Sequence, residues 1–508
     1  SFISLSLPLI LSLTISALIY QNALSAPYIF DDFIIICFNH QMSSWHDFLS
    51  GLYLGPSHTY PDLRSRPLLY LYYYLVRLIG KNDPYYFRML LIVLHSINII
   101  LVYALIKTII NNFYTSRNHN KKILALLTTA FWALHPIHAY TVGNISKTST
   151  VLASCFFLLS VMCFVRTLEN KQSYLSVIFF SLSFASKEEA VVLPFFLLLW
   201  ILFFTTKEQW QIQIKKAVPH FVALILILLA RYFAFNSNFY APGLKGDFNF
   251  SQAYAYGLNQ VVVVALYLFQ LIFPTSTSKI FLYYPIRSIV STPFALEFIA
   301  AFLFLLMLVG VAIFFTMKNF ITKNKMQSCW RPTIISILFL PISFFLLISP
   351  ASSFIPQESL ISGCRTYLPS IFFSLLFMMA IKKASDYLKQ RFFLKQRLLF
   401  LLQTGFFVYG IVFFSYTTYT TTEHLLKIKH VNILWKEEMI FFESLSYSDP
   451  ELLRTPYMEI MNLYMLKMSE NQHTLSLQMI QKINRAYKVF YYSKDISELK
   501  VMLQKFEN

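Results

Sequence analysis

Two adjacent carboxylates, Asp31 and Asp32, directly follow the apolar run 2–29, which is long enough to cross a bilayer. Carboxylates beside hydrocarbon are costly unless they are solvated or paired, so such a pair needs a reason. At the water interface, one carboxylate could act as a general base on a hydroxyl group while the other assists it. The alternative is that the pair caps the next short helix.

The composition predicts the framework that must position this pair. Of the 508 residues, 56% are hydrophobic and only 13% are charged, and the mean hydropathy is +0.55. A soluble protein could not cover that much apolar surface, so we expect an all-α polytopic membrane protein. The formal charge of +18 suggests nucleic-acid binding. However, residues 420–508 carry 11 Lys/Arg and 11 Asp/Glu, so the excess lies between the apolar segments, where it orients helices.

Hydropathy windows of about 20 residues predict about eleven transmembrane helices. The expected spans are 3–22, 87–110, 122–135, 148–165, 173–186, 190–205, 217–235, 293–316, 332–349, 366–381 and 398–417. We interpret the first as a retained anchor. The segment 257–273 is also apolar, but we expect it to lie in the interface or to re-enter the membrane within a large outer loop, 236–292.

Basic residues are concentrated in five of the connections between these spans. The five are 111–122, 166–172, 206–216, 317–331 and 382–397, which together hold 18 Lys/Arg. The positive-inside rule places them on the cytoplasmic side. The aspartate pair, the outer loops 23–86 and 236–292 and the C-terminal tail then lie outside.

The outer side also collects ionisable residues at several helix ends, which predicts one polar cavity that opens outward. The candidate binding residues are Arg66, His135, His138, Lys187, Glu188 and Arg365. Each has a structural alternative: an arginine that anchors a helix at the interface, imidazoles that cap a helix ended by proline, or a solvated turn between helices. We interpret Glu189 as a solvated loop residue.

Five stretches, in order across most of 25–385, resemble glycosyltransferases of the multi-spanning GT-C fold. They are YIFDDF, SRPLLYLYYYLVRLIGKNDPYYFRMLLIVLH, HPIHAYTVGNISKTSTVLAS, SKEEAVVLP and PASSFIPQESLISGCRTYLPSIFFSLL. The likeness is to O-mannosyltransferases that join a membrane module to C-terminal tetratricopeptide repeats, and to their bacterial relatives. The family's usual Gly-Arg reads Ser146-Lys147 here. Its Glu-Arg-Leu-Tyr reads Cys364-Arg365-Thr366-Tyr367, which keeps the arginine and loses the acid.

The resemblance implies two domains: a GT-C-like membrane module, 1–419, and a small helical outer domain, 420–508, that resembles tetratricopeptide repeats of about 34 residues. Within the tail, LWKEEMIFFESLSYSDPELLRTPYMEIMNLYMLK resembles the entry into such a repeat. A helical hairpin there could bind an acceptor polypeptide. The alternative is a cap that only packs on the outer loops.

The resemblance also implies a chemistry. A sugar, mannose or similar, would pass with inversion from a polyprenyl phosphate to an acceptor hydroxyl, with Asp31 or Asp32 as the base; we favour Asp31. Arg66, Lys187, Arg365 and the two histidines would stabilise the phosphate leaving group. No cofactor is expected beyond the lipid-linked donor. A divalent metal is not indicated, because Pro136 breaks the helical spacing of His135 and His138.

The sequence leaves several interpretations of the function open. The acceptor could be a protein Ser/Thr or, as in aminoarabinose transferases, a lipid or glycan. A transporter predicts polar residues in mid-helix, which are scarce here; a non-catalytic membrane scaffold would not need the aspartate pair. The partners expected are membrane lipids, the lipid-linked sugar and an acceptor, without nucleic acid. The abundance of Ile, Lys, Asn and Phe favours a bacterial inner membrane with a periplasmic site over an endoplasmic-reticulum membrane with a lumenal one.

Overall fold

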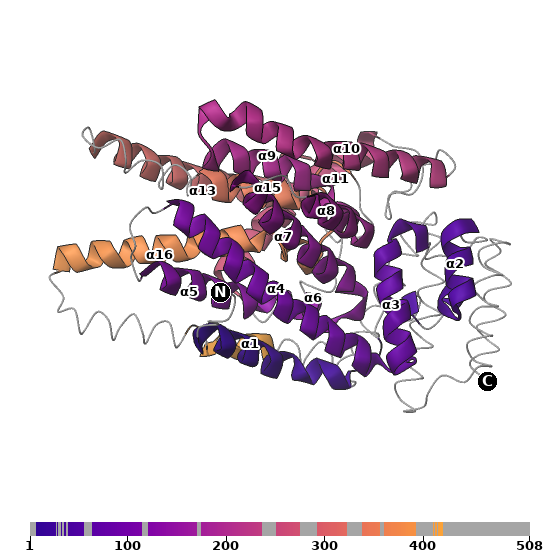
Figure 1. The fold of residues 1–508 in the computed structure, drawn as a ribbon. Helices are drawn as coiled ribbons and strands as arrows, with labels where there is room; N and C mark the ends of the chain where they lie inside the picture. Colours follow the sequence, from indigo (N-terminus) through magenta and orange to yellow (C-terminus); the bar gives the residue numbers. More distant parts are fainter. Residues whose placement is uncertain are drawn as a thin grey trace.

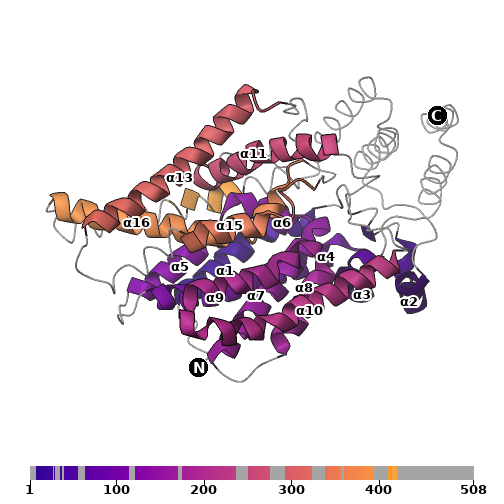
Figure 2. The ribbon, with the colours of Figure 1, turned by 90° about the horizontal axis from the view of Figure 1, so that it is seen from above.

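The longer helices of the protein pack side by side as a bundle, seen from two sides in Figures 1 and 2. The computed structural model describes residues 7–26, 28, 32, 35–36, 39–54, 63–113, 120–169, 174–235, 250–274, 292–322, 338–355, 360–392, 410, 412–413 and 415–419. Every regular element in these ranges is helical. The expected tetratricopeptide-like domain, 420–508, lies outside the described residues, as does the aspartate Asp31.

The longer helices form the body of the bundle. They are α1 (Leu7–Tyr20), α4 (Pro84–Phe113), α5 (Asn120–Ala133), α7 (Thr148–Glu169), α8 (Leu175–Ser186), α9 (Leu193–Phe204), α10 (Trp210–Ala234), α11 (Phe250–Ile272), α13 (Leu296–Thr322), α15 (Leu340–Ile348) and α16 (Ser370–Phe392). Helices α2 (Trp45–Leu54) and α3 (Pro67–Gly80) lie at one end of the bundle, while α13 and α16 reach the opposite end in both views (Figures 1 and 2).

Four helices in the described part are long and apolar enough to cross a membrane, so the protein is a membrane protein. They cover Pro84–Phe113, Ile145–Leu168, Lys207–Ala234 and Ala253–Ile272. The count of about eleven spans is not confirmed. One reason is that several expected spans form short helices: α8 and α9 have 12 residues each, about 18 Å at 1.5 Å per residue, against a hydrocarbon core of about 30 Å.

The segment 257–273 forms the greater part of α11, within a helix of sufficient length and apolar character to span the membrane. It packs against α13, and its buried residues Val263, Val264 and Leu268 belong to a hydrophobic cluster that Phe304, Leu305 and Leu308 of α13 also pack against. The prediction that it lies in the interface therefore stays a prediction. A membrane crossing at this point would reverse the orientation that the basic loops assign to the later helices.

Local sequence explains where key elements begin and bend. Helix α4 starts at Pro84, and the Asp83 side chain accepts the amide N–H of Tyr85 at 2.8 Å, which caps the first turn. Helix α5 ends before Pro136, and the short helix α6 (Ala139–Gly143) continues after a bend of 46°. Proline cannot supply the amide that would continue α5. The Leu134 carbonyl at this break accepts a hydrogen bond from Thr418 at 2.7 Å.

Small hydroxyl residues hold the tightly packed pair α7 and α8 together. Ser160 and Ser176 each donate to the other's backbone carbonyl, at 2.7 and 2.8 Å. Ser183 donates to the Ala153 carbonyl at 2.7 Å. Small polar residues allow close approach of helices where burial of apolar surface gives little driving force in lipid. These contacts fix the start of α7, which carries Thr150, and the end of α8, which Lys187 directly follows.

Candidate active site

Asp32 is fully buried and is held by a backbone amide and an arginine. Its Oδ1 accepts the N–H of Ser146 at 2.8 Å, and its Oδ2 lies 3.8 Å from Nη2 of Arg88, with both side chains 0% exposed. Arg88 also donates to the carbonyl oxygens of Gly143, at 3.1 Å, and Ala26. The arrangement ties the first loop to α4 and to the turn after α6.

The turn that receives Asp32 is rigid for local reasons. Asn144 caps the short helix Ile145–Lys147. Its Oδ1 accepts hydrogen bonds from the Ser146 N–H at 3.0 Å and from the Ser146 hydroxyl at 2.9 Å. The Ile145 carbonyl oxygen accepts hydrogen bonds from the hydroxyls of Tyr73 and Thr148, both at 2.7 Å. Residues 145–148 are therefore held from several sides, and α7 follows directly.

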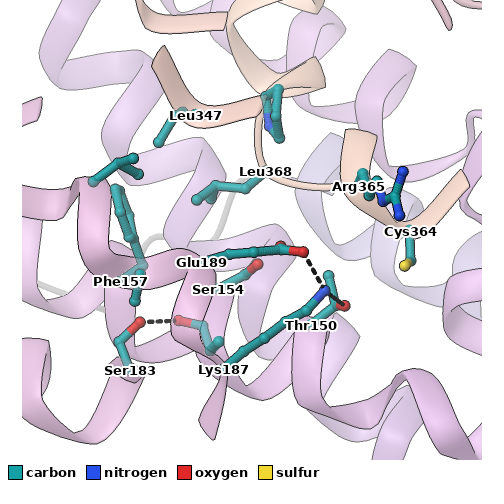
Figure 3. Close-up of a pocket in the computed structure, with 14 residues that line it drawn as sticks. Thr150, Ser154, Phe157, Ser183, Lys187, Glu189, Leu347, Cys364, Arg365 and Leu368 are labelled. Atoms are coloured by element: carbon teal, nitrogen blue, oxygen red, sulfur yellow. Dashed lines mark hydrogen bonds and ion pairs between the residues drawn. The ribbon is translucent and has the colours of Figure 1, made fainter. Parts of the chain in front are cut away.

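Two residues further along α7, Thr150 lines a pocket with Lys187, Glu189, Cys364 and Arg365 (Figure 3). Lys187 Nζ donates to Thr150 Oγ1 at 2.9 Å and lies 2.8 Å from Glu189 Oε1. The short helix Gly363–Thr366 supplies Cys364 and Arg365 from the segment between α15 and α16. The cavity volume is about 30 Å³, which is room for one or two water molecules.

The pocket lining carries two cations, Lys187 and Arg365, and one carboxylate, Glu189. Lys187 and Arg365 are 8% and 7% exposed. Burial by itself raises the pKa of the Cys364 thiol, but the charges of Lys187 and Lys147 outweigh this and hold the pKa below its usual value. Three cations therefore act in this region, with Glu189 as the carboxylate on the pocket wall. Such a cluster suits an anion with several oxygen atoms.

Arg66 and Glu188 form a second ion pair beside the pocket. The guanidinium donates to both carboxylate oxygens, Nε to Oε2 at 3.0 Å and Nη2 to Oε1 at 2.7 Å. Burial of Glu188 would raise its pKa, but the charge and hydrogen bonds of Arg66, with a contribution from Arg231, lower the pKa to about 2. Neither residue lines the pocket. They connect the start of α3 to the turn after α8.

His135 and His138 lie in the buried interior, apart from the pocket lining. His135 accepts the N–H of Ile137 at 3.2 Å, and its Nε2 lies 3.3 Å from the Leu271 carbonyl oxygen. His138 lies 3.3 Å from the Ser370 hydroxyl and packs edge-to-face on the ring of Tyr367. Both therefore have structural contacts at the break between α5 and α6.

The structure thus groups the predicted residues in a specific way. Lys187 and Arg365 share the pocket, and Asp32 binds the turn that leads to it. Arg66 and Glu188 bind each other next to the pocket. The interpretation of Glu189 as a solvated loop residue is wrong, because its side chain is only 30% exposed and pairs with Lys187.

Sequence reasoning missed Arg88, Lys147, Thr150 and Cys364. Arg88 gave a usable signal, because an arginine near the start of a 30-residue apolar helix is costly unless it is paired. Lys147 stands where the resembling family has arginine, so its charge could also have been noted. Thr150 and Cys364 gave no signal, since neutral residues beside a turn are common. Among the described residues, no group of three or more His, Cys, Asp or Glu side chains is placed to hold a metal ion.

Comparison with known proteins gives a distant similarity. No family model matches the chain. Human protein O-mannosyl-transferase TMTC1 is 28% identical over 162 residues, which is 30% of this chain and 17% of the relative. Xenopus laevis protein O-mannosyl-transferase tmtc2 is 27% identical over 162 residues, and human TMTC2 is 28% identical over 153, covering 18% and 17% of those relatives.

The chain is distantly similar to protein O-mannosyl-transferases. The matched stretch covers less than a fifth of the length of these relatives. These relatives are of the kind that the five sequence stretches resemble, and the similarity covers only part of the chain.

Proposed function

We propose that this protein is an integral membrane glycosyltransferase of the GT-C type. It transfers a sugar, mannose or a close relative, from a polyprenyl phosphate to an acceptor hydroxyl, a protein Ser or Thr, on the outer face of the membrane. The observation that carries this proposal is the buried cationic pocket of Lys187 and Arg365. Thr150, which lines this pocket, lies in α7 only a few residues from the turn that Asp32 binds. The distant similarity to protein O-mannosyl-transferases supports it.

The pocket suits the leaving group of such a reaction. When the bond between the anomeric carbon and the phosphate oxygen breaks, the phosphate keeps the electron pair and gains negative charge. Lys187, Arg365 and Lys147 offer positive charge in a region of low solvent exposure, where electrostatic stabilisation is strong. A donor lipid would keep its apolar chain in the bilayer while its phosphate reaches these residues.

The carboxylates divide into two roles in this proposal. Asp32 is fully buried, accepts a backbone N–H and pairs with Arg88, so we assign it to holding the turn in place. Asp31, the neighbouring residue in the sequence, is the proposed base. It takes the proton from the acceptor hydroxyl as that oxygen bonds to the anomeric carbon and the phosphate departs. One base suffices, because no enzyme nucleophile is needed.

The remaining parts of the proposal follow from the sequence. The tail, 420–508, would bind the acceptor polypeptide through helical repeats. The protein would lie in a bacterial inner membrane with its site on the periplasmic side, or in an endoplasmic-reticulum membrane with a lumenal site. The partners would be membrane lipids, the polyprenyl-phosphate sugar and an acceptor protein.

The aspartates give the decisive test. In purified protein supplied with a polyprenyl-phosphate mannose and a Ser/Thr peptide, Asp31→Asn should reduce transfer by about 10²-fold or more while donor binding is kept. Asp32→Asn should lower thermal stability and leave more activity. Equal, small effects at both positions would overturn the base assignment and favour a non-catalytic scaffold. Transfer to a lipid or glycan instead of the peptide would replace the proposed acceptor class.

The cations give a complementary test. Lys187→Met or Arg365→Ala should reduce kcat more than donor affinity, because the charge that they meet grows in the transition state. Loss of donor binding with unchanged turnover would demote both residues to docking contacts.

A further inference from the structure

The cationic pocket contains a carboxylate of the protein's own. Glu189 and Lys187 extend toward the same point beside Thr150 (Figure 3). Glu189 Oε1 lies 2.8 Å from Lys187 Nζ, which also donates to Thr150 at 2.9 Å. The ammonium group is largely buried, with the Lys187 side chain 10% exposed. A buried ammonium needs such partners, since an unpaired one is costly.

A carboxylate oxygen and a phosphate oxygen make the same contact with an ammonium. Charge-assisted N–H to O contacts have lengths of about 2.7–2.9 Å for both. The Glu189 carboxylate therefore takes the position at Lys187 that a phosphate oxygen would take. Thr150 lies in α7, while Glu189 lies in the short helix Glu188–Val192 and is more exposed, at 30%. Of the two side-chain partners that Lys187 has among the described residues, Glu189 is the more exposed, so its side chain is the one that can turn toward water.

The small size of the pocket also indicates that a side chain must move before a phosphate can bind. A cavity of about 30 Å³ holds one or two water molecules, and a phosphate group with its ester oxygen needs more space. A phosphate can therefore reach Lys187 and Arg365 only if a side chain moves. Displacement of Glu189 would supply both the space and the released positive charge.

We propose that Glu189 is an internal counter-ion that competes with phosphate for Lys187. The proposal rests on the proposed function, in which the ligand is the phosphate of a polyprenyl lipid. Binding of the phosphate exchanges one anion for another at Lys187, so the ammonium is never left buried without a partner. The same exchange in reverse assists release of the polyprenyl phosphate after transfer.

Competition within the protein has a measurable consequence. A ligand that must displace an internal anion binds more weakly than it would to the same pocket without that anion. Removal of the negative charge at position 189 should therefore strengthen phosphate binding. A residue that only orients Lys187 would have the opposite effect.

The experiment measures ligand binding by the full-length protein in lipid nanodiscs. The test variant is Glu189→Gln, with Glu189→Ala as a second test. The matched control is Glu188→Gln, the neighbouring carboxylate, which pairs with Arg66 and does not line the pocket. The probes are a short-chain prenyl phosphate, the corresponding prenol and inorganic phosphate. Thermal unfolding of each variant shows that it is folded.

We expect Glu189→Gln and Glu189→Ala to bind the prenyl phosphate about tenfold more tightly, which is about 1.4 kcal/mol. The affinity of Glu188→Gln should not rise more than twofold, and prenol binding should not change in any variant. The gain should vanish when Lys187→Met is added. A similar gain for inorganic phosphate would identify the phosphate group alone as the competing ligand, while a gain confined to prenyl phosphate would identify the lipid phosphate; both support the exchange.

Unchanged or weaker prenyl-phosphate binding in both Glu189 variants would overturn the proposal, as would an equal gain for prenol. An equal gain in Glu188→Gln would assign the effect to general charge rather than to the pocket, and would also overturn it. The proposed function fails separately. If the affinity gain is present but no variant transfers sugar from a lipid donor, the counter-ion role stands and the transfer reaction does not.

Discussion

Nη2 of Arg88 lies 3.8 Å from Oδ2 of Asp32, and neither side chain is exposed. A buried ion pair contributes little net stability by itself, because desolvation offsets the attraction, but loss of one partner leaves a buried charge without compensation. In this protein the arginine also binds two carbonyl oxygens and the aspartate binds an amide. The pair therefore joins three chain segments at one point.

We predict that Arg88→Met lowers the free energy of unfolding by about 3–5 kcal/mol, because it removes the cation that pairs with the buried Asp32 carboxylate. The double variant Asp32→Asn with Arg88→Met should lose less stability than Arg88→Met alone, because it also removes the buried negative charge that Arg88 compensates. Chemical unfolding in mild detergent measures both. Identical losses in the single and double variants would show that the two side chains do not interact energetically.

The Arg66–Glu188 pair predicts a pH dependence. The pKa of Glu188 is about 2 in the folded protein, and an unpaired glutamate has a pKa of about 4.3. The pair therefore contributes its full stability above pH 4.3, and the contribution is lost as the pH falls toward 2. Glu188→Gln should lower stability at pH 7 by on the order of 1 kcal/mol.

The same variant should show a flatter decline of the unfolding temperature between pH 4.3 and 2 than the parent protein. The matched control is Glu297→Gln, an exposed glutamate in the first turn of α13. If Glu188→Gln and the parent decline in parallel, the ion pair does not govern acid stability in this window.

Cys364 gives a direct probe of the charge in the pocket. Lys187 and Lys147 hold the pKa of its thiol below the usual value despite burial. In a variant that keeps Cys364 as the sole cysteine, modification by a small thiosulfonate, which forms a mixed disulfide, should therefore have its pH midpoint below that of an unperturbed cysteine thiol, because the thiolate is the reactive form. Addition of Lys187→Met should move the midpoint upward. A midpoint in the parent at or above that of an unperturbed cysteine thiol would contradict the cationic pocket.

Tyr367 anchors the segment that carries Arg365. Its hydroxyl lies 2.6 Å from Nδ1 of His95 and accepts a hydrogen bond from Asn98 at 3.2 Å, while its carbonyl accepts Trp132 Nε1–H at 3.0 Å. Tyr367→Phe keeps the ring but leaves buried polar groups unsatisfied. We predict a loss of about 1–3 kcal/mol in unfolding free energy, measured by thermal and chemical unfolding.

Tyr416→Phe is the control for this substitution, because Tyr416 is 68% exposed. Its stability should change by less than about 0.5 kcal/mol. An equally small effect of Tyr367→Phe would show that the hydroxyl does not anchor the segment.

The sequence predicted the helical membrane class, because apolar composition decides whether a chain can be soluble. The lengths of individual helices were less predictable from the sequence. Helix α9 covers Leu193–Phe204, which is 12 residues, against an expected span of 190–205. Hydropathy windows average over caps and breaks, and the break at Pro136 shows how one such position divides a helix.

The candidate site was partly predictable for a similar reason. Charged residues at helix ends stand out, so Lys187, Arg365, Arg66 and Glu188 could each be named from the sequence. Their partners could not, because pairing depends on packing between distant segments: Arg66 and Glu188 are 122 positions apart. The histidines show the converse: their place at a helix end on the outer side predicted a polar cavity, while the structure buries both of them in contact with aromatic rings.

The contacts of Tyr367 also determine when the pocket can exist during biogenesis. Its hydroxyl binds His95, 272 positions earlier in the chain. Contacts at such separation form only after the intervening helices have entered the membrane and packed. A nascent chain inserted as far as α9 already carries Lys187 and Glu189 but not Arg365. The pocket is therefore completed only after the segment that carries Arg365 has been made, and a chain truncated before this segment cannot assemble it.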